Sequence, residues 1–358
     1  MHIGLLTGGG DCPGLNAVIR AVTLALLEAA PQTRITGIER GFLGLLEDRH
    51  RPLDAAAVRD ILDEGGTLLG THNRADPFRY FGAGGADCSG RALDTVGRLG
   101  LDALVVMGGD GTMTISERFA RLGLPVLGVP KTIDNDIVGN ERSFGFDSAV
   151  AVVAEALGRL RTTARSHGRV MLLETMGREA GWIALEGGLA GGADAILIPE
   201  QPYELARLAA FCRQRVAQQG YALVCLAEGI APPPGWLPQP GTHHGGAQGG
   251  VGQLLMQALQ AEMASQVGAS SEPLELRYSL LGHLQRGGSP TAYDRVLSTR
   301  FGVAAAQALQ RGEFGRMVAL QGDRCLSLPL GEVAGRARSV TPDAELLRAA
   351  RALGVCLG

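Results

Sequence analysis

Residues 104–112 (LVVMGGDGT) and 126–136 (VLGVPKTIDND) decide the fold class of this chain. Each stretch begins with a short apolar run, which predicts a buried strand, and continues into a polar loop. Open α/β sheets bind ligands at the carboxyl ends of such strands, so we expect both loops at one sheet edge. Glycine N–H groups for phosphates, a carboxylate for Mg²⁺ and a second carboxylate to accept an alcohol proton together favour phosphoryl transfer.

The composition predicts about two domains with enough apolar material for a core. The chain has 358 residues, 46% of them hydrophobic, and exceeds the length of an average domain. Its 33 Lys and Arg residues against 36 Asp and Glu residues argue against a generic nucleic-acid binder, which carries a basic excess. Six cysteines form no C-x-x-C pair, and no stretch resembles a signal peptide or a membrane span. We therefore expect a cytoplasmic protein with reduced thiols and with no membrane or nucleic-acid partner.

Apolar runs alternate with amphipathic stretches along the chain. This alternation predicts an α/β fold, with two Rossmann-like lobes of mainly parallel sheets flanked by helices, divided near residue 145. Predicted strands occupy residues 2–6, 34–38, 103–107, 126–129, 170–174, 195–198, 222–227 and 277–281. Predicted helices occupy residues 15–28, 55–63, 148–163, 203–218, 254–265, 292–310 and 343–353. The Pro- and Gly-rich stretch 231–250 contains His243 and His244 and predicts an exposed loop rather than a metal site.

Two further features of the first half suit an anion and a metal. The segment 7–16 (TGGGDCPGLN) joins the first predicted strand to the first predicted helix, where glycines allow close approach to an anion. An ordinary tight turn explains the same pattern, and the spacing is that of neither a P-loop nor a dinucleotide-binding turn. Asp110, between glycines at a strand end, is either a Mg²⁺ ligand or the cap of the following helix.

Thr132, Asp134 and Asp136 alternate along the segment 131–136 and point to one side if that segment is extended. Two close carboxylates do not titrate alike, so one can hold a metal while the other accepts a proton. The alternative is an Asx-turn network that closes the loop. Lys131 and Thr132 beside the carboxylates favour the functional interpretation.

Basic residues gather around the later predicted strands. Arg178 follows the strand at 170–174 and suits a transferred phosphoryl group, although alone it is more typical of a helix surface. Arg169 precedes the same strand, and Arg277, His283 and Arg286 surround the strand at 277–281. Each one alone predicts a surface charge, and together they predict a sugar-phosphate pocket, because guanidinium groups bind two phosphate oxygens at once.

These segments, in this order, closely resemble the 6-phosphofructokinase family over most of the chain. The resemblance rests on TGGGDCPGLNAVIR at 7–20, GGTLLGT at 65–71, GGDGT at 108–112, PKTIDND at 130–136, LLETMGR at 172–178, AEG at 227–229 and LGHLQRGGSPTAYDR at 281–295. NAD kinases and diacylglycerol kinases share GGDGT, whereas PKTIDND with GHLQRGGSP is specific. The resemblance implies a glycolytic kinase that uses Mg-ATP to phosphorylate the 1-hydroxyl of fructose 6-phosphate.

The resemblance also implies roles for the matching residues. Asp134 would be the base, Thr132 and Arg178 would stabilise the moving phosphoryl group, and Asp110 with Asp136 would bind Mg²⁺. The donor site would contain Gly10, Arg74, Gly109, Asp110, Gly111 and Thr112. The sugar site would add to Thr132, Asp134 and Arg178 the residues Met176, Gly177, Glu228, His283 and Arg286, of which the last two would bind the 6-phosphate.

The family's architecture implies a shared active site. Arg169 and Arg277 match two arginines that reach the 6-phosphate from a neighbouring subunit, so we expect a homotetramer. A larger lobe, 1–145 with about 285–335, would bind ATP and Mg²⁺. A smaller lobe, about 146–284 with 336–358, would bind fructose 6-phosphate. Arg20 and Arg161 match two effector-site residues of bacterial members, but Leu24 and residues 218–221 depart from that pattern, which predicts altered effector control.

Gly111 and Lys131 bear on the phosphoryl donor. Pyrophosphate-using members carry aspartate at the position of Gly111, where its side chain occupies the space of the nucleotide α-phosphate, so glycine favours ATP. Lys131 is shared with pyrophosphate enzymes, and the mixed Gly/Lys state also occurs in ATP-dependent members. We therefore favour ATP, with a pyrophosphate-dependent enzyme as the alternative and a non-catalytic regulatory subunit as a remote one.

Overall fold

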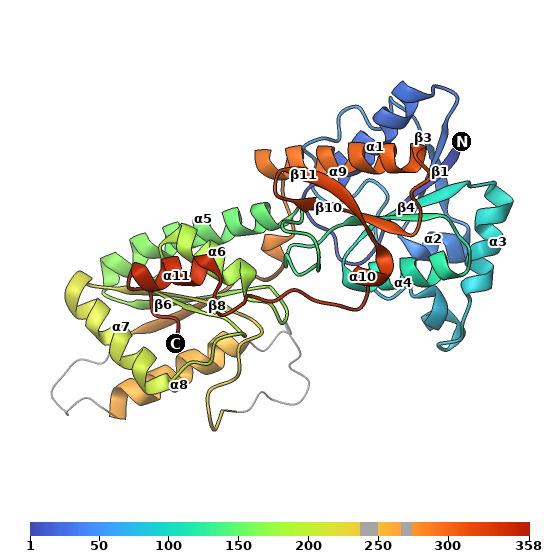
Figure 1. Cartoon of the computed structure of the whole chain (residues 1–358). Coiled ribbons are helices and arrows are strands. Elements are labelled where there is room, and N and C mark those ends of the chain that lie inside the picture. The colour runs from blue at the N-terminus through green and yellow to red at the C-terminus, as the bar shows by residue number, and fades with distance from the viewer. Residues whose placement is uncertain (237–249, 266–273) are drawn as a thin grey trace. The chain divides into compact units, whose positions relative to one another are not determined.

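The computed structural model describes residues 1–236, 250–265 and 274–358. The chain divides into two compact units, residues 1–148 with 286–338 and residues 149–285 with 339–358. Each unit has its own sheet, coloured by position along the chain in Figure 1. The predicted α/β fold class is confirmed.

A seven-stranded sheet forms the centre of the first unit. Its strand order is β11-β10-β5-β4-β1-β2-β3, parallel in the middle and closed on both edges by antiparallel strands. The direction of winding changes between β1 and β4, which is where open α/β sheets form a ligand crevice. The strands are β1 (His2–Thr7), β2 (Arg34–Ile38), β3 (His50–Leu53), β4 (Ala103–Gly108), β5 (Val126–Pro130), β10 (Arg316–Gln321) and β11 (Arg324–Pro329).

Helices cover both faces of this sheet (Figure 1). One face carries α1 (Leu15–Ala29) and α9 (Ala292–Gln310), and the other carries α2 (Phe42–Glu47), α3 (Ser89–Leu99), α4 (Asp110–Arg121) and α10 (Leu330–Val333). Short 3₁₀ helices occur at η1 (Pro77–Arg79) and η2 (Phe81–Ala83). β1 and β4 are buried along their whole length, because a parallel sheet covered on both faces exposes neither set of side chains.

The second unit contains a four-stranded, fully parallel sheet. Its order is β7-β8-β6-β9, formed by β6 (Val170–Thr175), β7 (Ala195–Leu197), β8 (Ala222–Ala227) and β9 (Leu276–Leu280). One face carries α5 (Phe146–His167), α6 (Trp182–Gly191) and α11 (Glu345–Ala352), and the other carries α7 (Leu205–Gln219) and α8 (Val251–Ser265) (Figure 1). The 3₁₀ helix η3 (Gly282–Gln285) follows β9.

Some predicted elements differ from the structure. The helix predicted over 55–63 is wrong, because this segment forms turns with long i to i+3 hydrogen bonds, such as Arg59 N to Ala56 O at 3.4 Å. The carbonyl of Arg59 accepts instead from Arg20 Nε at 3.2 Å. Much of the stretch 231–250, including His243 and His244, lies outside the described residues.

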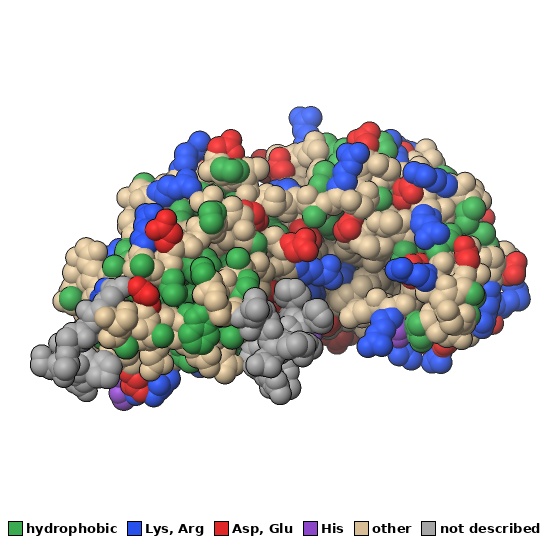
Figure 2. All heavy atoms as spheres, turned by 90° about the horizontal axis from the view of Figure 1, so that it is seen from below, with side chains coloured by type: hydrophobic (Ala, Val, Ile, Leu, Met, Phe, Trp, Pro, Cys, Tyr) green, Lys and Arg blue, Asp and Glu red, His purple; other side chains and the backbone are tan. Residues whose placement is uncertain are grey.

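The surface agrees with the near balance of charges in the sequence. Figure 2 shows basic and acidic side chains interspersed over one face. The formal net charge is −3. Among the described residues, no helix is long and apolar enough to cross a bilayer.

Candidate active site

Three polar loops meet at one edge of the first sheet. They follow β1, β4 and β5, which are neighbouring parallel strands, so their carboxyl ends lie side by side. Backbone hydrogen bonds join the loops: Gly8 N donates to Met107 O at 2.8 Å, and Lys131 N donates to Gly108 O at 2.9 Å. The apolar runs predicted this neighbourhood for the loops after β4 and β5, and the structure adds the loop after β1.

The loops contain glycine for two different physical reasons. A Cβ on Gly8 or on Gly108 would lie 2.8 or 2.3 Å from the side chain of Thr112, so close packing requires glycine at both positions. Thr112 itself is buried. Gly111 is different, because it is exposed and a Cβ there would meet no protein atom within 4 Å. Protein packing therefore does not require glycine at position 111, and the space beside it is open to a ligand.

Two cationic side chains donate hydrogen bonds to carbonyl groups of the loop after β1, residues 8–14, which we call the first glycine loop. The buried ammonium of Lys131 donates to Gly10 O. Arg286 Nη1 donates to Asp11 O at 3.1 Å, and a Cβ on Gly10 would lie 3.0 Å from the same nitrogen. Arg286, predicted at the sugar phosphate, thus contacts the glycine loop in the first unit. These cations add positive charge beside the loop, which favours an anionic ligand.

The segment after β5 is not extended, so the condition under which Thr132, Asp134 and Asp136 would point to one side is not met. Thr132 and Asp134 are 7% and 2% exposed, and Asp136 is half-buried. Asp134 N donates to Thr132 Oγ1 at 3.0 Å, and Asn135 has φ of 54°, a left-handed conformation that costs free energy for a residue with a Cβ. A turn closed by the Thr132 hydroxyl is thus present beside the buried Asp134, rather than the Asx turn that was the alternative to a functional interpretation.

Arg338 holds this strained turn, and sequence reasoning missed it. Its Nε and Nη2 donate to Asn135 O at 3.2 and 3.0 Å, and its backbone N donates to Asp136 O at 2.7 Å. Burial lowers the pKa of Arg338, while the charges of Glu141 and Asp136 act in the opposite direction. Arg338 is about two hundred residues from the turn, so no local pattern links the two.

Asp110 begins α4, and its Oδ1 accepts from Gly335 N at 2.8 Å. Within the described parts of the chain, no group of three His, Cys, Asp or Glu side chains is placed to hold a metal. Mg²⁺ commonly binds through one or two carboxylates together with substrate phosphates and waters. The oxygen donors Asp110 and Asp136 fit that kind of site and do not form an all-protein cage.

Arg74 is an exposed residue of the loop after β3. The nearby Thr71 Oγ1 donates to Thr7 O at 3.1 Å, which fastens this loop to the first glycine loop. Burial first, and then the charges of Arg40 and Arg74, lower the pKa of His72. His72 also stacks on Phe81 with ring centroids 5.2 Å apart. Arg74 therefore belongs to a basic group beside the glycine loop.

In the second unit, Arg178 and Glu228 come together at the carboxyl edge of the sheet. Arg178 N donates to Glu228 Oε1 at 3.0 Å, and Glu228 N donates to Thr175 O at 2.8 Å. Gly177 and Arg178 have φ of 145° and 53°, so this turn is strained. Met176 is half-buried in the same turn, and the exposed His283 follows neighbouring β9.

Arg169 and Arg277 lie at the other end of these strands. Arg169 directly precedes β6, and Arg277 pairs with the second residue of β6. At 3.3 Å per residue, the carboxyl end of β6, which Arg178 follows, is about 20 Å from Arg169 and about 13 Å from the level of Arg277. Both arginines form ion pairs with Glu275, a residue that the sequence analysis did not identify. The i, i+2 spacing of Glu275 and Arg277 along a strand was the available signal.

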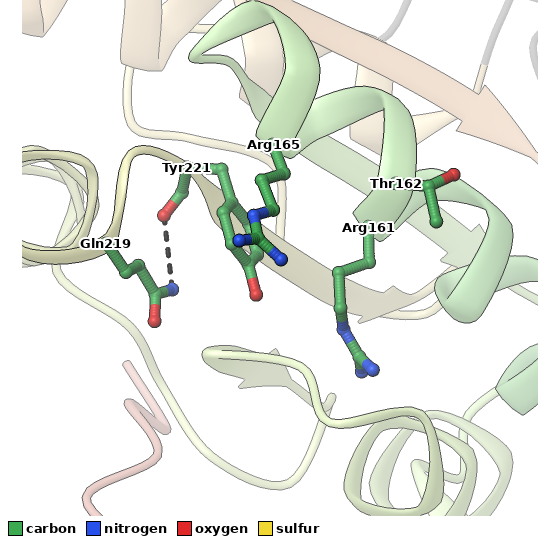
Figure 3. Close-up of a pocket in the computed structure, with 5 residues that line it drawn as sticks. All are labelled: Arg161, Thr162, Arg165, Gln219 and Tyr221. Atoms are coloured by element: carbon green, nitrogen blue, oxygen red, sulfur yellow. Dashed lines mark hydrogen bonds between the residues drawn. The ribbon is translucent and has the colours of Figure 1, made fainter.

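A basic pocket of about 350 Å³ lies within the second unit (Figure 3). Arg161, Thr162 and Arg165 of α5 line it together with Gln219 and Tyr221, and Gln219 Nε2 donates to Tyr221 O at 3.2 Å. Arg161 Nη2 also donates to Gly191 O. Arg161 matches an effector-site residue of bacterial members of the family that the sequence resembles. Altered effector control stays a prediction.

Known proteins resemble this chain over most of its length. The profile of the family described as Phosphofructokinase matches residues 2–309. An ATP-dependent 6-phosphofructokinase of Chloroflexus aurantiacus is 46% identical, with 100% of this chain and 98% of that protein covered. A pyrophosphate–fructose 6-phosphate 1-phosphotransferase of Streptomyces coelicolor is 42% identical, with 96% of this chain and 97% of that protein covered.

Solved structures show the same likeness. The phosphofructokinase of Pichia pastoris in the T-state superposes with a TM-score of 0.77 at 28% identity, over 93% of this chain. This chain spans only 35% of the length of that larger Pichia chain.

Proposed function

The chain belongs to the phosphofructokinase family, and we propose that it is an ATP-dependent 6-phosphofructokinase. It transfers the terminal phosphoryl group of ATP to the 1-hydroxyl of fructose 6-phosphate and releases fructose 1,6-bisphosphate and ADP. The observation that carries the proposal is the edge where β1, β4 and β5 end. That edge brings together a glycine loop, a helix N-terminus with Asp110, and the buried Asp134.

Position 111 supports ATP as the donor. Full-length relatives at 45–46% identity are named ATP-dependent 6-phosphofructokinase, and one at 42% is named for pyrophosphate, so overall likeness also favours ATP. Gly111 adds no charge and no atoms to an open, exposed position. Aspartate there would place a negative charge where a nucleotide carries its α-phosphate. We infer that Gly111 admits the nucleotide and that Lys131 is compatible with either donor.

Asp134 is proposed as the general base. The residue is 2% exposed, so its carboxylate is shielded from bulk water. A base of this kind takes the proton of the 1-hydroxyl as the oxygen attacks phosphorus. Thr132 and Arg178 would stabilise the phosphoryl oxygens. Asp110 and Asp136 would hold Mg²⁺, which when bound screens the charge of the donor phosphates.

Gly10, Arg74, Gly109 and Thr112 complete the proposed donor site. Met176, Gly177 and Glu228 would hold the sugar, since a strained turn fastened by a carboxylate keeps its donors in fixed directions. His283 and Arg286 would bind the 6-phosphate. The contact of Arg286 with Asp11 O fixes its guanidinium beside the glycine loop.

We propose that Arg169 and Arg277 serve the active site of another copy of the chain. Along β6, Arg169 lies about 20 Å and Arg277 about 13 Å from the strand end that carries Arg178, so a sugar phosphate bound beside Arg178 would not reach Arg169. A homotetramer with shared sites meets this constraint. Mixing Asp134→Asn and Arg277→Ala chains after mild dissociation should restore part of the activity that each homogeneous variant lacks. No recovery in the mixture would count against shared sites.

The first test is a parallel donor assay. The purified chain is given fructose 6-phosphate and Mg²⁺ with either ATP or pyrophosphate, and fructose 1,6-bisphosphate is measured. We expect product with ATP only. Product with pyrophosphate only would overturn the choice of donor, and no product with either donor would overturn the proposed activity.

A further inference from the structure

Glu275 bridges two arginines of the second unit. Its Oε2 pairs with Arg169 Nε, and its Oε1 pairs with Arg277 Nη2, so each carboxylate oxygen holds one guanidinium group. The side chains of Glu275, Arg169 and Arg277 are 39%, 24% and 53% exposed. The three groups therefore form a compact cluster, open to solvent, with a formal charge of +1.

The backbone fixes this cluster. Val170 N donates to Glu275 O at 3.1 Å, and Val170 pairs with Leu276 in the parallel register of β6 and β9. Glu275 consequently stands beside Arg169 across the strand pair, and Arg277 follows on the same side of the chain. The cluster thus arises from strand pairing as well as from side-chain rotamers.

A carboxylate and a phosphate compete for the same guanidinium donors. Arginine pairs with either group through parallel N–H···O bonds. A phosphate monoester carries about −1.5 to −2 charges at neutral pH, against one for a carboxylate. An incoming phosphate can therefore take over both arginines, but only after the carboxylate of Glu275 leaves them.

We propose that Glu275 is a built-in competitor of the sugar phosphate at Arg169 and Arg277. It occupies both guanidinium groups in the free protein and weakens the binding of fructose 6-phosphate. This inference rests on the proposed function, because it takes these arginines as phosphate ligands. The effect is moderate, since partly exposed ion pairs contribute little each. We expect a change in affinity of about 3- to 10-fold.

The test is the variant Glu275→Gln, which keeps the shape of the side chain and removes its charge. The KM for fructose 6-phosphate at saturating Mg-ATP should fall by about 3- to 10-fold, with kcat within about a factor of two. The matched control is Glu155→Gln, because Glu155 forms an Arg–Glu ion pair with Arg159 on α5 of the same unit. This control should leave the KM unchanged.

A double-mutant cycle assigns the effect to the arginines. In an Arg277→Gln background, Glu275→Gln should lower the KM by less than it does in the native chain. An unchanged KM in the single variant would show that Glu275 is a bystander. A raised KM would show that it aligns the arginines for phosphate. Either result overturns the proposal.

A binding measurement separates this proposal from the proposed reaction. Calorimetric titration with inorganic phosphate, without nucleotide, should show tighter binding to Glu275→Gln than to the native chain. If the native chain does not phosphorylate fructose 6-phosphate, the proposed reaction fails. If the native chain and Glu275→Gln bind phosphate equally well, the proposed competitor role of Glu275 is wrong, even if the chain catalyses the proposed reaction.

Discussion

Gly111→Asp should separate the choice of donor from the stability of the fold. Gly111 is the second residue of α4, is exposed, and would place a Cβ with no protein atom within 4 Å. Its φ is not in the left-handed region, so a side chain introduces no strain. Aspartate near a helix N-terminus is favourable by about 0.3–1 kcal/mol. We therefore expect the thermal midpoint of the variant to stay equal or rise.

The effect on ATP is electrostatic. A carboxylate at about 4 Å from a phosphate charge costs about 1 kcal/mol at the dielectric constant of water and about 4 kcal/mol at an effective value of 20. Because 1.36 kcal/mol is a factor of ten, kcat/KM for ATP should fall by about 5- to 1000-fold. The exposure of position 111 places the expected loss toward the lower part of that range.

The assay measures kcat/KM for ATP and for pyrophosphate, with the thermal midpoint recorded in parallel. The matched control is Gly90→Asp, since Gly90 is also the exposed second residue of a helix, α3, with no atom within 4 Å of a Cβ. This control should keep full ATP activity. Native kcat/KM for ATP in Gly111→Asp would refute the argument that an open position 111 admits the nucleotide.

Three further changes test other parts of the site and the fold. Asp134→Asn should lower kcat by about 10²- to 10⁴-fold while calorimetry still detects fructose 6-phosphate binding; near-native turnover would remove Asp134 as the base. Arg338→Ala loses the donors to Asn135 O and should lower kcat more than it raises KM, with partial rescue by Arg338→Lys; equal thermal destabilisation without a kcat effect would make its role structural. Burial raises the pKa of Asp294 from 3.8 to about 6, so the folded state binds more protons and this contribution to stability falls as pH rises from about 4 to 6. Asp294→Asn should remove about 1.4 kcal/mol of that loss between pH 5 and pH 7.5, measured by urea unfolding at these two pH values; identical pH slopes for both proteins would contradict it.

The central strands of both sheets were predictable because burial on both faces requires a continuous run of apolar residues in the sequence. Strands such as β4 and β8 are continuous apolar runs, and a short run of that kind between glycines has few alternative structures. The edge strands β3 and β11 of the larger sheet were missed for the converse reason, and the internal β10 was missed although it is mostly buried. β11 is half-exposed along most of its length, so its sequence carries a weak apolar pattern. The false helix at 55–63 contains buried Val58 and Ile61, whose spacing suits a turn as well as a helix.

The residues of the candidate site also fall into those that were predictable from the sequence and those that were not. The positions of Asp110, Thr132 and Arg178 after strands were predicted correctly, because an apolar run marks where each strand ends; their roles stay predictions. The contacts of Arg338 with Asn135 and of Glu275 with Arg169 join residues far apart in the sequence, and one sequence contains no signal for such pairs; only the contact of Glu275 with Arg277 is local. The left-handed Asn135 was also missed, since the alternation of Thr132 and Asp134 suits an extended segment equally well.

Lys131 shows why a residue shared by both donor types need not choose between them. Its ammonium donates to Gly10 O and its backbone N to Gly108 O, so it fastens the first glycine loop to the second. In the proposed donor site, both loops would face the phosphates that ATP and pyrophosphate have in common, and either donor would need the loops held together. Discrimination requires a position that meets the part of ATP that pyrophosphate lacks. Gly111 is exposed and open, so a side chain there acts on the ligand rather than on the fold. The donor preference should therefore follow position 111 even when Lys131 is kept.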